Sequence, residues 1–399
     1  LVVGIVTGVI LVANRSGEVE GGRAAWSPVD LLPRITPSFF GVYEGKTGYF
    51  RLIASWGSSK TFQSTDSSVA TITSDGHFTA LDIGALPFAT TRITGSADGV
   101  LSKNFAYLLV SSYPRELTVA FGKKTVFYMP TTQMHIVSRN NILLPKAMDL
   151  AYEIQGRATH IRYPAENPLL MISVDSNACG GNGNPLRFGE KCFLDETDDQ
   201  TVQWDILFHE MGHNSTHHSW NDFGVLGVHA AVTMPVPLYQ EANATLLGLY
   251  TMQQITGLPA VLNQPTHESI QKRYEKKISF FGNRLAEYEK NGSPFAEDGQ
   301  KAGLTIDALD GGYLRLISKS KYRWGAVVRF MRVFQPSSKT DALVLSDGVT
   351  PQERATFHAA AMQVATGLDV RTQFKQWNFP IDDALFDKLL PVFEELVAR

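Results

Sequence analysis

Alternating apolar and polar positions dominate the chain between residues 37 and 111. Five short runs there combine β-branched or aromatic residues with a period of two, which predicts half-buried strands. The runs are residues 49–54, 69–73, 77–80, 91–94 and 105–110. A Ser-Asp-Gly turn at residues 74–76 separates two of them. The spacing predicts a small antiparallel β-sandwich over residues 37–112, with no combination of residues that suggests catalysis.

The hydrophobic pattern changes after residue 112. Within residues 113–198 it predicts strands and one helix, at residues 117–121, 125–128, 169–174 and 142–155. Residues 199–399 are mainly helical in pattern, with helices expected at residues 268–290, 322–334, 351–366 and 382–397. The sequence therefore predicts a multidomain chain, in which an all-β sandwich precedes an α+β domain that ends in a largely helical part.

Residues 1–14 form a separate apolar segment that ends in Asn14, followed by Arg15. The segment is too short to span a bilayer by itself. Three interpretations stay open: a truncated membrane anchor, which we favour, the apolar part of a signal peptide, or a plain buried strand. The first two predict an exported protein, extracellular or at the cell surface. Residues 15–36, which carry Gly, Ser, Pro and Arg without periodicity, would then be a linker.

The most informative motif is H-E-x-x-H at residues 209–213. On a helix, His209 and His213 lie one turn apart and project from one face, where two imidazoles can bind one Zn²⁺ ion per chain. Glu210 then faces the same metal without binding it, and can move a proton from water to a leaving amine. The alternative is a metal-free core helix, which would bury Glu210 at a high cost. The motif indicates zinc-dependent hydrolysis of peptide bonds.

A catalytic zinc site needs a third protein ligand and one open position. A third histidine six residues after His213 is excluded, because Ser219 stands there. Asp222 lies in a Trp-Asn-Asp stretch that is typical of a turn. Glu241 begins an Ala- and Leu-rich segment that predicts a buried helix, and a carboxylate in such a helix needs a cation. We therefore predict three metal ligands: His209, His213 and Glu241.

Other motifs surround and follow H-E-x-x-H along the chain. The stretch from Trp204 to Asn214, with Glu241-x-Asn243 and Tyr250 behind it, resembles the enhancin-type zinc metallopeptidases, a gluzincin family that includes secreted bacterial mucinases. Two later stretches, residues 321–330 and 366–381, agree with the same family. The likeness covers roughly residues 115–385. It departs from the family pattern at two positions, Val370 in place of Leu and Asn378 where Gly is more usual.

The resemblance implies a gluzincin metallopeptidase domain over residues 113–399, with substrate along a sheet edge. It also implies O-glycosylated, mucin-like protein as the substrate. Residues 64–81 are similar to the bacterial immunoglobulin-like repeat, which implies an immunoglobulin-like module that acts as a spacer or adhesive unit. Two alternatives remain: a gluzincin that cuts unglycosylated peptides, and an adhesin whose peptidase-like domain is inactive. The intact Glu210 argues against the adhesin.

Three residues are candidates for binding sugars by stacking or hydrogen bonding, and each of them could equally be structural: Asn184, Arg187 and Trp220. His217 and His218 are expected to be a solvated pair after the zinc helix. Tyr250 is expected to face away from Glu241 and to fill the core.

Composition and cysteine content agree with an exported enzyme. The chain has 399 residues, 44% of them hydrophobic, and a formal net charge of −3 without a Lys/Arg cluster, so nucleic acid is not an evident partner and we expect a monomer. Its two cysteines, Cys179 and Cys192, enclose a Gly- and Asn-rich loop. A disulfide would order that loop, whereas a zinc site there would need further ligands.

Overall fold

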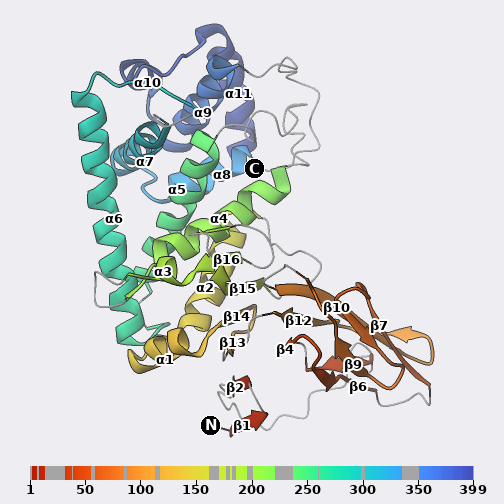
Figure 1. The fold of residues 1–399 in the computed structure, drawn as a ribbon. Coiled ribbons are helices and arrows are strands. Elements are labelled where there is room, and N and C mark those ends of the chain that lie inside the picture. Colours follow the sequence, from red (N-terminus) through yellow and green to blue (C-terminus); the bar gives the residue numbers. More distant parts are fainter. Residues whose placement is uncertain are drawn as a thin grey trace. The chain divides into compact units, whose positions relative to one another are not determined.

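The computed structural model describes residues 2–6, 9–13, 32–37, 39–54, 59–84, 88–112, 117–160, 170–176, 180–181, 186–195, 201–220, 237–258, 260–297, 302–334 and 350–398. The chain divides into two compact units. The first consists of Leu1–Phe121, Val126–His135 and Ser173–Ser176, and the second of Gly122–Thr125, Ile136–Ile172 and Asn177–Arg399. The first unit is rich in strands and the second is mainly helical (Figure 1). This confirms the expected order, in which a sheet-rich region precedes a helical one.

The larger sheet of the first unit has five strands. They are β4 (Phe39–Tyr43), β7 (Lys60–Ser64), β10 (Phe88–Ala97), β11 (Val100–Leu101) and β12 (Ala106–Ser111). β10 pairs antiparallel with β7, β11 and β12, but β12 pairs parallel with β4. A parallel pair needs a long crossover, and the chain between β4 and β12 provides one. The expectation of a purely antiparallel sandwich is therefore wrong, and the immunoglobulin-like topology stays a prediction.

Two smaller sheets complete this part of the chain. β3 (Arg34–Thr36) pairs with β6 (Arg51–Ile53), and β9 (His77–Ala80) lies between β5 (Thr47–Tyr49) and β8 (Ala70–Ile72). In β9 exposed and buried positions alternate, so Phe78 enters the core, where its ring contacts Phe40 and Phe50 edge-on or tilted. Gly76 turns the chain before β9 with a φ of +94°, at a point where a side chain would collide with the Phe50 carbonyl. The period-two pattern and the predicted turn are thus confirmed.

The apolar N-terminal segment forms two strands. β1 (Val2–Val6) and β2 (Val9–Ala13) pair antiparallel. β2 also pairs parallel with β13 (Leu117–Phe121), and β13 pairs antiparallel with β14 (Thr125–Pro130). Of the three interpretations of this segment, the strand is the one that the fold contains; export and anchoring stay predictions. Among the described residues, no helix combines the length and apolar character needed to cross a bilayer.

The remaining strands are β15 (Leu170–Ser176), β16 (Leu186–Gly189), β17 (Leu194–Asp195) and β18 (Thr201–Val202). Eleven helices lie among the described residues: α1 (Thr131–Arg139), α2 (Leu144–Thr159), α3 (Glu190–Phe193), α4 (Trp204–Trp220), α5 (Pro237–Thr256), α6 (Gln264–Lys290), α7 (Ala302–Lys319), α8 (Gly325–Val333), α9 (Pro351–Thr366), α10 (Arg371–Gln376) and α11 (Asp383–Ala398). The four helices expected at residues 268–290, 322–334, 351–366 and 382–397 correspond to α6, α8, α9 and α11.

Local signals explain where α9 begins and ends. Thr350 accepts a hydrogen bond from the backbone of Glu353, and the Glu353 carboxylate accepts one from the backbone of Thr350, which is a complete capping box. Pro351 follows at the first helical position, and Gly367 ends the helix with a left-handed φ of 68°. Helix α9 packs against α8 and α11 in the core of the second unit, with nearly every residue buried.

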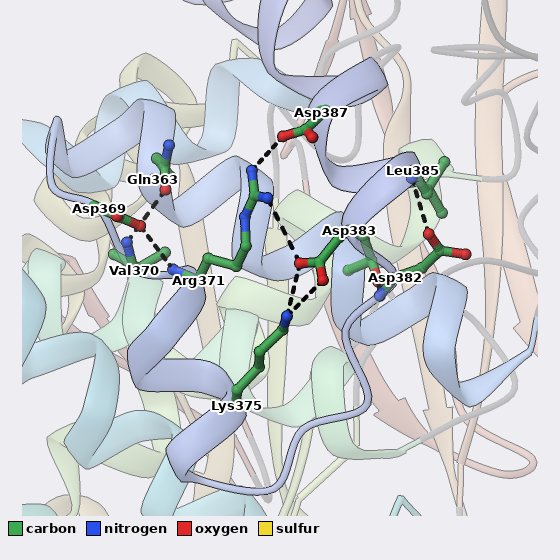
Figure 2. Close-up of polar contacts among 10 residues, drawn as sticks. Gln363, Asp369, Val370, Arg371, Lys375, Asp382, Asp383, Leu385 and Asp387 are labelled. Atoms are coloured by element: carbon green, nitrogen blue, oxygen red, sulfur yellow. Dashed lines mark hydrogen bonds and ion pairs between the residues drawn. The ribbon is translucent and has the colours of Figure 1, made fainter.

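The two departures from the family pattern have structural reasons. Asn378 has a φ of 57°, a left-handed conformation that glycine adopts freely and asparagine tolerates. Val370 is fully buried in the helical core. Between them, Arg371 pairs with Asp383 and Asp387, and Lys375 pairs with Asp383 at 2.7 Å, which joins α10 to α11 (Figure 2). The closing segment of the family-like region is therefore a structural part of the helical core.

Candidate metal centre

Helices α4 and α5 bring the three predicted ligands together. His209 Nε2 lies 3.0 Å from Glu241 Oε2 and 3.0 Å from His213 Nε2, and His213 Nε2 lies 3.5 Å from Glu241 Oε1. One atom from each residue therefore faces a common point, and the three atoms all lie within 4.8 Å of one another. The imidazole rings stand nearly perpendicular, with their centroids 4.6 Å apart. The sequence motif and the proposed third ligand thus meet in space.

Small residues let α4 and α5 approach closely enough for this geometry. A Cβ atom on Gly212 would lie 2.8 Å from the carbonyl oxygen of Ala244, and one on Gly248 would lie 3.2 Å from the backbone nitrogen of His209. Larger side chains at these positions would push the helices apart and separate Glu241 from the two histidines. The glycine inside the H-E-x-x-H motif and the Ala/Gly spacing of α5 are therefore part of how the site forms.

The donor set suits a Zn²⁺ ion. Two imidazole nitrogens and one carboxylate are ligands that zinc prefers, and a three-residue set leaves a fourth position for water or substrate. Although burial acts to raise the pKa of Glu241, hydrogen bonds from His209 and His213 hold that pKa below its ordinary value. The carboxylate is therefore ionised, as a metal ligand must be. His209, His213 and Glu241 can hold one metal ion.

The second nitrogen of His209 has a partner of its own. Its Nδ1 lies 3.0 Å from the hydroxyl of Thr245, which stands one helical turn after Glu241 on α5. When Nδ1–H donates to Thr245, the ring is fixed and Nε2 keeps its lone pair for a metal, so that His209 Nε2 and Glu241 would face one another as two ligands of the ion and not as donor and acceptor. His213 differs, because its Nδ1 is buried without a hydrogen-bond partner among the described residues. Thr245 was not among the residues singled out from the sequence, although its position four residues after Glu241 could have indicated it.

Glu210 is placed beside the ligands in a partly dry environment. Burial raises its pKa to about 7, with a smaller opposing effect from His213. The backbone of Gly180 passes so close that a side chain at this position would collide with the Glu210 carboxylate. Gly180 therefore lies at the metal centre, a contact that no periodicity in the sequence reveals.

A cavity of about 240 Å³ opens beside His209 and Glu210. Its walls also carry four apolar side chains from α4, α5 and α6: Ile206, Leu249, Met252 and Phe281. Asp205 and Lys277, which form an ion pair at 2.7 Å, line it as well. A substrate side chain next to the reacting bond has room in this cavity, and most of its surface there would meet hydrocarbon.

The other predicted residues have mixed outcomes. Arg187 is exposed on β16, and its backbone N–H donates to the carbonyl of Gly181, the residue after Gly180, at 3.0 Å. Trp220 ends α4, but its side chain lies outside the described residues, as do those of His217 and His218. The described residues also exclude all of Asn184, Asp222 and Cys179.

Two further sequence-based expectations concern Tyr250 and the cysteines. Tyr250 is half-buried against the helical core and lies next to Trp324, which confirms that it packs away from the metal ligands. Cys192 is disulfide-bonded, and no described cysteine has a free thiol. The predicted pairing with Cys179 stays a prediction, because that residue is not described.

The chain has distant likenesses among solved structures. No protein-family model and no curated protein matches the chain. Among solved structures, it is similar to the catalytic module of the metalloprotease ZmpA from Clostridium perfringens, with 14% identity, a TM-score of 0.40, and coverage of 83% of this chain and 70% of that one. A functionally unknown conserved protein mutant from Bacillus anthracis str. Ames gives 10% identity, a TM-score of 0.40, and coverage of 92% and 70%.

The human protocadherin-24 EC1-2 structure gives 13% identity and a TM-score of 0.18 over 25% of this chain. The chain spans about half the length of that protocadherin fragment, 51%. Likenesses at this level do not assign a family. The geometry of the metal centre is therefore the basis for a function.

Proposed function

We propose that the chain is a zinc-dependent peptidase of the gluzincin type. The observation that carries the proposal is the convergence of His209 Nε2, His213 Nε2 and a Glu241 carboxylate oxygen on one point, with Glu210 beside them. His209, His213 and Glu241 would hold the ion. Zinc in such a site supplies Lewis-acid chemistry, since it polarises a carbonyl group and acidifies water.

Glu210 carries the proton transfers in this scheme. Its carboxylate accepts a proton from the attacking water as the new C–O bond forms, and donates it to the amine nitrogen as the C–N bond breaks. A base with a pKa near neutrality suits both steps, because it must accept and then release the same proton. Burial at the cavity wall keeps bulk water away from this exchange.

For the substrate, we propose O-glycosylated, mucin-like protein, cut by an exported or surface-bound enzyme. This rests on the sequence resemblance to enhancin-type mucinases. The exposed Arg187 supports it as a group that could bind a sugar, because its backbone bonds to Gly181, the neighbour of the Gly180 that contacts Glu210. Arg187, Asn184 and Trp220 remain the candidates for glycan binding. The partner is thus a glycoprotein, and nucleic acid has no role in the proposal.

A second candidate is a peptidase that reads an amino-acid side chain and ignores glycans. The apolar walls that Ile206, Leu249 and Met252 give to the cavity beside Glu210 favour this alternative. An unmodified peptide with an aliphatic or aromatic residue next to the cut bond would fill that cavity and bury apolar surface. An inactive adhesin is disfavoured by the presence of Glu210.

One pair of substrates separates these candidates. A peptide with one O-glycosylated Thr and the same peptide without glycan would be incubated with the zinc-loaded protein, and with protein treated with a chelator. Cleavage of the glycopeptide alone, lost on chelation, supports the mucinase. Equal cleavage of both, with a preference for an apolar residue beside the bond, supports the second candidate. Metal-independent cleavage would overturn both proposals.

Metal content provides the matched control. Purified protein should hold about one zinc ion per chain, and His213→Ala and Glu241→Ala should lose it. Arg187→Ala should keep zinc and lose only glycopeptide cleavage. Full zinc occupancy in Glu241→Ala would remove Glu241 from the ligand set.

A further inference from the structure

Asp310 on α7 is an ionisable residue buried without an obvious reason. It is 2% exposed, and neither carboxylate oxygen has a hydrogen-bond partner among the described residues. Burial raises its pKa well above the ordinary value. A buried acid without a partner costs stability, so a chain that keeps one at this position needs a reason outside folding.

A cavity places Asp310 on the same wall as two residues of the metal centre. Glu241, Thr245, Asp307 and Asp310 all line it, on α5 and α7. Asp307 pairs with Arg284 at 2.8 Å, and its charge adds to the effect of burial on the Asp310 pKa. Asp310 thus forms no ion pair with a described residue, although it lines the same cavity as the predicted ligand Glu241.

Thr245 stands between Asp310 and the metal ligand His209. Its hydroxyl lies 3.0 Å from His209 Nδ1 and lines the same cavity as Asp310. No hydrogen bond of good geometry joins Thr245 to Asp310, but the hydroxyl acts to lower the Asp310 pKa against the larger effects of burial and of the Asp307 and Glu241 charges. A hydroxyl has one hydrogen to donate and lone pairs to accept with. If Nδ1–H donates to Thr245, the hydroxyl hydrogen is free to turn toward an Asp310 oxygen.

We propose that Asp310 is a positioning residue of the metal centre, which acts through Thr245 to fix the ring and tautomer of His209. The order of donation runs from His209 Nδ1–H to Thr245 Oγ1, and from the Thr245 hydroxyl to the Asp310 carboxyl group. This order leaves Nε2 of His209 as the lone pair that faces the ion. The inference rests on the proposed zinc site and adds two residues to it.

Zinc affinity, measured by competition with a chromophoric chelator, tests the role of each residue. Thr245→Val removes the hydroxyl at nearly constant shape and should weaken zinc binding about 10- to 100-fold, the usual effect of losing a group that orients a ligand. Asp310→Leu should weaken zinc binding about tenfold, because Asp310 is one hydrogen bond further than Thr245 from the ligand His209. Thr245→Ser keeps a hydroxyl at this position and should bind zinc about as tightly as the wild type. Ile306→Val, on the same helix and cavity, is the matched control and should bind zinc as the wild type does.

The double variant tests whether Asp310 acts through Thr245. In the Thr245→Val background, Asp310→Leu should produce no further loss of zinc affinity, because the link is already broken. Independent, additive losses would overturn the inference. A second measurement, the absorption spectrum of the Co²⁺-loaded protein, should change in Thr245→Val and Asp310→Leu and stay unchanged in Ile306→Val.

Thermal unfolding of the metal-free protein separates a positioning role from a structural one. Asp310→Leu replaces a buried acid without a partner by an apolar group, so the metal-free variant should be as stable as the wild type or more stable. A destabilised variant with unchanged zinc affinity would overturn the inference and leave the zinc site standing. A wild-type protein that binds no zinc would overturn both.

Discussion

The two units of the chain differ in how completely their buried polar groups are hydrogen-bonded. In the sheet-rich unit, Thr91 is buried but bonded to the hydroxyl of Ser64 and the backbone of Asp66, and Asn104 both donates to and accepts from the backbone of Ile35. Among the described residues of that unit, Gln133 alone keeps a buried side-chain atom without a partner. The helical unit holds all the others: His213, Tyr239, Asn243, Asp310 and His358.

The difference indicates where the sequence serves purposes other than stability. Buried polar atoms without partners are costly, and they persist at sites that need them. His213 is itself a predicted ligand, Asn243 follows Glu241 by two residues, and Asp310 lines the cavity next to Glu241. In the sheet-rich unit, Gln133 is the single exception among the described residues, and the other buried side-chain polar atoms are satisfied.

The largest expected effect concerns the proton-transfer residue of the helical unit. Glu210→Gln keeps the shape of the side chain but cannot accept a proton, so turnover should fall on the order of 10²–10⁴-fold. Zinc content should not change, because Glu210 is not a ligand. Turnover would be measured on whichever peptide of the matched pair is cut. An active Glu210→Gln protein would indicate another base or a contaminating peptidase.

If the sheet-rich unit contributes only stability, a change in its core should lower the free energy of unfolding without changing zinc binding. Phe78→Ala removes a fully buried ring from the core of that unit and should cost about 3–5 kcal/mol of unfolding free energy. Thr79→Ala, at an exposed position of the same strand, is the control and should change little. Urea unfolding gives the free energies, and zinc content of the folded fraction gives the second measurement. A loss of zinc in Phe78→Ala would show that the two regions are not separable.

The metal centre illustrates what the sequence could and could not predict. His209 and His213 follow from helical spacing alone, and Glu241 from the need for a cation at the start of a buried helix. Thr245 and Asp310 act through contacts between helices, which periodicity does not encode. In the sheet-rich unit, alternation predicted which side chains of β9 are buried, but not the parallel pairing of β12 with β4, since pairing partners depend on contacts far apart in the chain.

A smaller effect is expected from the loop that passes Glu210. Gly180→Ala adds a methyl group where the Glu210 carboxylate now lies, so the carboxylate must move and turnover should fall about 10- to 100-fold with zinc retained. Gly181→Ala is a close control, because its added Cβ would meet only ordinary contacts with Arg187. If both variants keep full turnover, Glu210 can act from another position and the close approach of the loop has no catalytic role.

The smallest effect should come from Tyr239 on α5, whose buried hydroxyl forms no hydrogen bond of good geometry. Burial raises its pKa, and Glu297 lies near enough to add to that effect. Its ring stacks on His358 at a centroid distance of 4.2 Å and an interplanar angle of 10°, a contact that phenylalanine can make equally well. Tyr239→Phe should therefore change the unfolding free energy by less than about 1 kcal/mol, in the stabilising direction, because it removes a polar group that burial leaves unsatisfied. Zinc affinity should stay that of the wild type, in contrast to Asp310→Leu. A loss of zinc affinity in Tyr239→Phe would mean that partnerless polar groups in this unit serve the metal centre collectively, and that Asp310 is not distinguished by its link through Thr245.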